Sequence, residues 1–96
     1  MGATLNTAVG MNAYTLTDRA TWISFNNRQN HRILYQGDKN LFNQYGVIRV
    51  NDAKCPNVKA AEGQTFIDWL ISDKGQDLIA TYQLDGEQLF YPNASR

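Results

Sequence analysis

The chain has 96 residues, 43% of them hydrophobic and 11% aromatic, which is enough for one small domain with a modest core. Nine Lys and Arg balance nine Asp and Glu, so the basic surface of a nucleic-acid-binding protein is missing and no such partner is expected. The apolar runs are far shorter than the roughly 20 residues of a membrane-spanning helix, which predicts a soluble chain. The first residues lack the pattern of a secretion signal, so the chain as written is expected to be cytoplasmic or to be missing its front.

The first half of the chain predicts alternating helices and strands. Residues 4–11 place apolar side chains at helical spacing, and residues 13–17 are rich in the aromatic and β-branched types of a short buried strand. Thr17 or Asp18 can cap a second helix, which ends before a polar loop. Residues 32–35 then predict another strand.

The second half predicts one strand followed by two helices. Residues 45–50 form the strand pattern, and Asn57 is expected to cap a helix that continues to Leu70 with the strongest periodicity in the chain. Ser72 can cap the next helix, which predicts a short corner between the two. Asp85 and Gly86 indicate a turn near the end of the chain.

No combination of side chains in the sequence predicts catalysis or metal binding. The chain has one histidine, one cysteine and carboxylates at no recognised spacing, so an enzyme and a cofactor are both not expected. Cys55 is interpreted as a small residue at a loop end, and His31 as an exposed imidazole without a ligand. Phe66 and Trp69 lie at helical spacing and are assigned to packing.

Two segments suit a small anion, because each brings hydroxyl groups or glycine to an expected helix start. Free N–H groups and the helix dipole at such a position attract negative charge. Ordinary capping remains an alternative for both segments, Tyr14 can instead belong to the core, and Arg19 can instead pair with a carboxylate or cap a helix end. The candidate residues are Gly2, Ala3, Thr4, Tyr14, Thr15, Leu16, Thr17, Asp18 and Arg19.

Several ordered blocks of the sequence resemble the C-terminal part of tungstate-type periplasmic solute-binding proteins of ABC transporters. The resemblance covers essentially the whole chain and is more specific than any one short motif. The blocks are residues 1–6, 13–22, 41–48, 56–61, 66–70, 75–76 and 89–94.

The resemblance implies an α/β fold, namely a fragment of the two-lobe type II periplasmic binding protein fold with short strands covered by helices. Residues 1–42 would finish the second lobe and residues 43–96 would return to the first. It also implies tungstate or molybdate as the ligand, an ABC transporter permease as the partner, and a periplasmic or extracytoplasmic parent protein. The candidate residues would then lie at the cleft between the lobes.

Part of the family's binding site has no counterpart in this sequence. The Thr/Ser-rich ligand loop and the Arg- and Ser-containing loop of the resembled family precede the matching region. The isolated chain is therefore expected to bind weakly or not at all. An alternative is that the chain is a stand-alone interaction module that forms an obligate homodimer. Exposed strand edges and apolar patches would favour such association.

Overall fold

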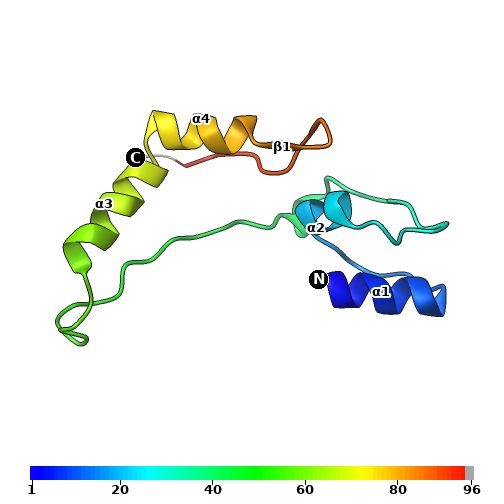
Figure 1. Ribbon diagram of the computed structural model, residues 1–96, viewed down its shortest axis with the longest axis horizontal. Coiled ribbons are helices and arrows are strands. Elements are labelled where there is room, and N and C mark those ends of the chain that lie inside the picture. Colours follow the sequence, from blue (N-terminus) through cyan, green and yellow to red (C-terminus); the bar gives the residue numbers. More distant parts are fainter. Residues whose placement is uncertain (95–96) are drawn as a thin grey trace. The chain divides into compact units, whose positions relative to one another are not determined.

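The computed structural model describes residues 1–94, which form two compact units (Figure 1). The first unit consists of Met1–Gln44 together with Gln83–Leu89. The second consists of Tyr45–Tyr82 and the segment that begins at Phe90. Each unit is built from short helices joined by long extended segments.

Helix α1, Gly2–Met11, forms part of the core of the first unit and confirms the helix predicted over residues 4–11. It buries Leu5, Ala8 and Val9, which follow one another at three- and one-residue steps on a single face. The helix ends at Asn12, whose left-handed φ of 53° lets the next N–H groups bond back to the last turn.

Helix α2, Arg19–Ser24, is closed by a charged side chain at each end. Asp18, one of the two predicted candidates, caps its start, and the buried pair Trp22 and Ile23 packs in the core of the first unit. At the other end Arg28 donates to the carbonyl oxygens of Trp22 at 2.8 Å and Ile23 at 3.3 Å. Its guanidinium also lies 4.5 Å from the centroid of the Trp22 ring, so one side chain caps the helix and covers its aromatic residue.

The strands predicted at residues 13–17 and 32–35 are extended segments without a backbone ladder, so both strand predictions are wrong. A hydrogen bond of 3.0 Å joins His31 Nε2 to the Ala13 carbonyl, and one of 2.7 Å joins Arg19 to Gln36 Oε1. Both bonds link positions 17 or 18 residues apart in the same order, so the two segments run parallel. A strand needs a hydrogen-bonded neighbour, and residues 1–94 do not provide one here.

A small hairpin is the sheet that the described residues do contain. Strands β1, Gln83–Leu84, and β2, Glu87–Gln88, pair antiparallel. Asp85 and Gly86 connect them with positive φ angles of 54° and 79°, which confirms the predicted turn. A short 3-10 helix, Lys39–Leu41, completes the first unit and is capped by Asp38.

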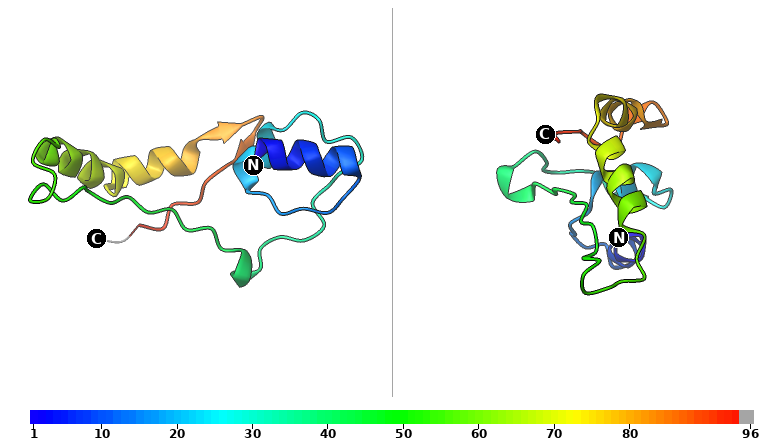
Figure 2. Two further views of the ribbon diagram at one scale, coloured as in Figure 1. Left: turned by 90° about the horizontal axis from the view of Figure 1, so that it is seen from below. Right: turned by 90° about the vertical axis from the view of Figure 1, so that its left-hand side faces the viewer.

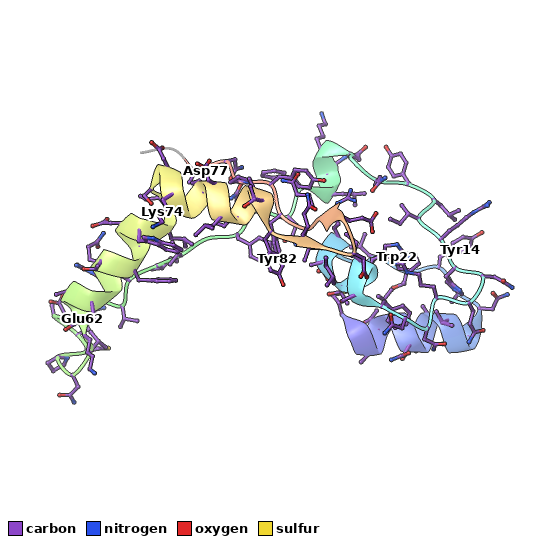
Figure 3. The ribbon with its side chains drawn as sticks, turned by 45° about the horizontal axis from the view of Figure 1, so that its top comes forward. Tyr14, Trp22, Glu62, Lys74, Asp77 and Tyr82 are labelled. Carbon is purple, nitrogen blue, oxygen red and sulfur yellow. The ribbon has the colours of Figure 1, made fainter. Side chains whose placement is uncertain are left out.

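The second unit contains helices α3, Ala60–Leu70, and α4, Asp73–Thr81, joined at a tight corner. Ser72 caps α4, as predicted, by accepting from the Gly75 N–H at 3.1 Å. The predicted cap of α3 is wrong, because the helix begins after Lys59 and no side chain caps it. Lys74 and Asp77 project from α4 (Figure 3).

Two further predictions for the second unit are wrong for the same reason. Residues 45–50 are extended but form no strand, and Phe66 and Trp69 are 56% and 43% exposed rather than packed in a core. An apolar helix face is buried only when another layer covers it, and the described residues supply no sheet for α3. The expected α/β layer is thus replaced by a mostly helical structure with one two-stranded hairpin.

Candidate anion-binding site

The start of α1 is an open helix N-terminus. Met1 occupies the cap position without a side-chain hydrogen bond, and the first helical bond runs from the Leu5 N–H to the Met1 carbonyl at 3.0 Å. The N–H groups of Gly2, Ala3 and Thr4 precede that bond and so have no acceptor within the helix. Ala3 and Thr4 are exposed, so three N–H groups and the positive end of the helix dipole are available to an anion.

The start of α2 is already occupied by an anion of the protein itself. The Asp18 carboxylate accepts from the Thr21 N–H at 3.1 Å and from the Thr21 hydroxyl at 3.0 Å. Partial burial acts to raise the pKa of Asp18, but the Thr21 hydrogen bonds outweigh it and the pKa lies below its ordinary value. Asp18 is therefore ionised at neutral pH and closes this helix start.

The hydroxyl groups between the two helices are engaged in local hydrogen bonds. Thr15 donates to the Leu16 carbonyl at 3.3 Å, and Thr17 donates to the Asp18 carbonyl at 3.0 Å. Tyr14 is 90% exposed, so its alternative assignment to the core is wrong (Figure 3). The reason is that no described layer covers the segment that carries it.

Arg19 is exposed and reaches away from α2. Its guanidinium donates to the Gln36 side-chain amide oxygen at 2.7 Å, which ties the start of α2 to the second extended segment. This contact is made with a neutral amide.

The structure brings the first predicted segment close to the end of the second, but not close to its beginning. The start of α1 lies beside the start of α2 in two perpendicular views (Figures 1 and 2). Gly2–Thr4 and Thr17–Arg19 are therefore neighbours. The segment that follows α1 runs back along the helix (Figure 1), and Tyr14 lies near the far end of α1 (Figure 3).

Two hollows in the second unit were not predicted from the sequence. One has a volume of about 420 Å³ and lies between the start of α4 and residues 92–94. The other, about 240 Å³, lies between residues 47–50 and α3. None of the nine predicted residues lines either hollow. Side chains for both come from distant parts of the sequence, which gives no local pattern.

Cys55 and His31 are the two other reactive side chains considered from the sequence. Cys55 is exposed in a loop, whereas His31 is half-buried and bonded to a carbonyl instead of being freely exposed. Within residues 1–94 no three His, Cys, Asp or Glu side chains gather in a way that could hold a metal ion. No helix in that range has the length and apolar character to cross a membrane.

Comparison with known sequences assigns the chain to a family. The family described as the PBP superfamily domain matches residues 1–74, so the chain belongs to it. This match confirms the predicted family of solute-binding proteins. It also confirms that the chain is a fragment of the periplasmic binding protein fold.

Individual relatives narrow this assignment. The chain is 43% identical over its whole length to the tungstate-binding protein TupA of Peptoclostridium acidaminophilum, of which it covers 34%. It is 40% identical over 98% of its length to a putative ABC transporter anion-binding protein of Haloferax volcanii, of which it covers 29%. The chain thus spans about a third of the length of these relatives, which are binding proteins rather than enzymes.

A solved structure supports the same assignment. The tungstate-binding protein TupA from Desulfovibrio alaskensis G20 matches 99% of this chain with a TM-score of 0.79 and 41% sequence identity. The match covers 40% of that protein. It therefore includes the extended segments that lack a strand partner here.

Proposed function

We propose that the chain is part of a solute-binding protein that captures tungstate, or a related oxyanion such as molybdate, and delivers it to an ABC transporter permease. The observation that carries the proposal is the 43% identity, over the whole chain, to a protein named for tungstate binding. The parent protein would work in the periplasm or another extracytoplasmic space. Residues 1–42 would complete one lobe and residues 43–96 would return to the other.

The open start of α1 supplies the best donors for such an anion. The N–H groups of Gly2 and Ala3, with the N–H and hydroxyl of Thr4, can donate to the oxygens of a tetrahedral dianion. These donors are neutral, and in a dry cleft they interact with the anion much more strongly than in water. We assign Gly2–Thr4 to direct contact.

The segment from Tyr14 to Arg19 has a supporting role in this proposal. The Asp18 carboxylate repels an anion held at α1, whereas the Arg19 guanidinium offsets that repulsion from the adjacent position. Thr15 and Thr17 would add hydroxyl donors if their present local bonds were exchanged during lobe closure. Tyr14 and Leu16 would face the opposite lobe, which accounts for their exposure.

The site carried by this chain is incomplete, so the isolated chain should bind tungstate weakly or not at all. An open helix start is hydrated, and water screens the attraction between its dipole and an anion. The test uses a hybrid protein, in which this chain replaces the matching 40% of the Desulfovibrio alaskensis relative. Isothermal titration with tungstate and with molybdate should give saturable heat for the hybrid protein and little for the chain alone.

A pair of threonine substitutions tests whether tungstate binds at the start of α1. Thr4→Val removes a hydroxyl at the open start, and we expect tungstate affinity to fall about tenfold, the effect of roughly one charge-assisted hydrogen bond. Thr7→Val is the matched control, because its hydroxyl lies one turn further along and donates to the Ala3 carbonyl at 2.9 Å. Equal losses from both variants, or none from either, would contradict the placement at α1.

The second candidate is a stand-alone interaction module that forms a homodimer. It is favoured by the many exposed large apolar side chains, among them Tyr14, Ile48 and Phe66. The mass of the 96-residue chain at high concentration, measured by light scattering, tests this second candidate. A dimeric mass would support this candidate, and a monomeric mass at high concentration would count against it.

A further inference from the structure

The turn of the small hairpin carries a dipeptide that occurs once in the chain. Asp85 is followed by Gly86, and no other Asp or Asn of the sequence precedes a glycine. Both residues are exposed at the tip between β1 and β2, with left-handed φ angles of 54° and 79°. Because glycine has no side chain, the nitrogen that joins the two residues is not shielded by a Cβ atom of its own residue.

The Asp85 carboxyl group is not held by the fold. Among residues 1–94 it has no hydrogen bond and no ion pair. Other aspartates of the first unit are held, since Asp18 and Asp38 accept from backbone N–H groups at 3.1 Å and 2.7 Å. The side chain of Asp85 can therefore turn toward its own main chain.

The nitrogen of Gly86 is also accessible. Within the part of the chain that the structure describes, its N–H makes no backbone hydrogen bond, and a Cβ atom on Gly86 would meet nothing within 4 Å beyond its chain neighbours. Asp52 and Ala53 form a contrasting pair in another exposed loop, where the Ala53 N–H donates to the Asn51 side chain at 2.9 Å. Both reacting groups are thus open at the hairpin tip, whereas the loop engages one of them.

We propose that Asp85 is a modification site, at which aspartate converts spontaneously to isoaspartate through a succinimide. The Gly86 nitrogen attacks Cγ of Asp85, an N–Cγ bond forms, and the Cγ–OH bond breaks, so that the hydroxyl leaves with the N–H proton as water. Water then opens the five-membered ring. Cleavage of the new N–Cγ bond restores aspartate, and cleavage of the bond between the nitrogen and the main-chain carbonyl carbon gives isoaspartate. One water leaves and one enters, so the mass is unchanged and no other reactant is needed.

The small size of the hairpin favours this reaction. Ring closure requires rotation about the Asp85 Cα–C bond, which intact pairing on both sides of the turn opposes. Strands β1 and β2 have only two residues each, and a hairpin of this size opens readily.

The product has a different turn. The main chain of isoaspartate passes through Cβ and Cγ, which adds one atom to a two-residue connection whose geometry fixes the strand register. The pairs Gln83–Gln88 and Leu84–Glu87 are then expected to separate.

The test follows the 96-residue chain during prolonged incubation at neutral pH, below its unfolding temperature. Trypsin cuts after Lys74 and releases residues 75–96, a peptide that contains both Asp77 and Asp85. Isoaspartate produces a second peptide of equal mass with a different elution time, and fragmentation identifies the position. We expect isoaspartate to accumulate at least about tenfold faster at Asp85 than at Asp77 or Asp52, because only Asp85 precedes a glycine.

Two substitutions separate the ring chemistry from other changes in the peptide. Asp85→Glu keeps the charge but would need a six-membered ring, so the second peptide should disappear. Asp85→Asn keeps a residue suited to this turn and should react faster, with a rise in mass because ammonia leaves in place of water. Equal isoaspartate at Asp85 and Asp77, a second peptide that persists in Asp85→Glu, or an Asp85→Asn chain of constant mass would each overturn the proposal. None of these results depends on tungstate, so the proposed function can fail without affecting them.

Discussion

The starts of α1 and α2 lie side by side but differ in which groups accept hydrogen bonds from their first N–H groups. At α1 the cap position is Met1, which makes no side-chain bond, and the first N–H groups are open. At α2 the Asp18 carboxylate accepts two hydrogen bonds from Thr21. One start can receive an anion from solution, whereas the other is closed by an anion of the chain.

This difference shows what makes a helix start a binding site. The first N–H groups of both helices have no acceptor within the helix and lie at the positive end of its dipole, so neither property separates the two starts. The side chain at the cap position decides, because a carboxylate there both uses the donors and repels further negative charge. Helix α4 adds a third case, since the Ser72 hydroxyl caps it and Gly75 in its first turn is buried.

The largest effect is expected at this third helix start. A Cβ atom on Gly75 would lie 2.3 Å from the Trp69 carbonyl oxygen and 2.7 Å from that of Leu70, and backbone atoms cannot move aside cheaply. Gly75→Ala should therefore lower the free energy of unfolding by about 3 kcal/mol, measured by urea denaturation followed by circular dichroism.

Gly63→Ala in α3 is the matched control for that experiment. Its Cβ would lie 3.7 Å from the Arg49 side chain, which is an ordinary contact, so the better helix propensity of alanine should stabilise by roughly 0.5–1 kcal/mol. If Gly75→Ala were as well tolerated as this control, the corner between α3 and α4 would be looser than its contacts indicate.

The next effect comes from closing the open start. Met1→Asp, with a short tag ahead of position 1, gives α1 the same kind of cap that α2 has. In the hybrid protein we expect tungstate affinity to fall at least about tenfold, or 1.4 kcal/mol, while α1 gains about 1 kcal/mol in stability. Met1→Leu should change neither quantity. Undiminished binding by the aspartate variant would show that the anion sits away from α1.

The sequence predicted helices well because their signals are local. Ser72 was expected as a cap from its residue type, as was either Thr17 or Asp18, and the apolar spacing around Leu5 and Ala8 was sufficient for α1. Strands depend on partners far away in the sequence. Residues 13–17, 32–35 and 45–50 have strand composition, but in residues 1–94 they have no ladder, so a local pattern could not settle their structure.

The candidate site was predicted in part for the same reason. Glycine and hydroxyl residues identified both helix starts, and Asp18 was one of two expected caps of α2, but the residue types did not show that the start of α1 stays open. The proximity of the two starts depends on how the chain turns back after α1 (Figure 1), which residue types do not encode. The location of donors was predictable, and their availability was not.

The smallest effect tests the closed start directly. Asp18→Ala removes the cap of α2 and should cost about 1 kcal/mol, whereas Asp18→Asn keeps an acceptor and should cost less. Because the pKa of Asp18 is lowered on folding, its contribution is present above its ordinary value of 3.8 and is lost as pH falls through the lower folded value. Urea denaturation at pH 6 should therefore separate Asp18→Ala from the parent chain more clearly than denaturation near pH 3. A gap that widened at acidic pH would mean that the carboxylate destabilises α2, and the contrast between the two helix starts would then fail.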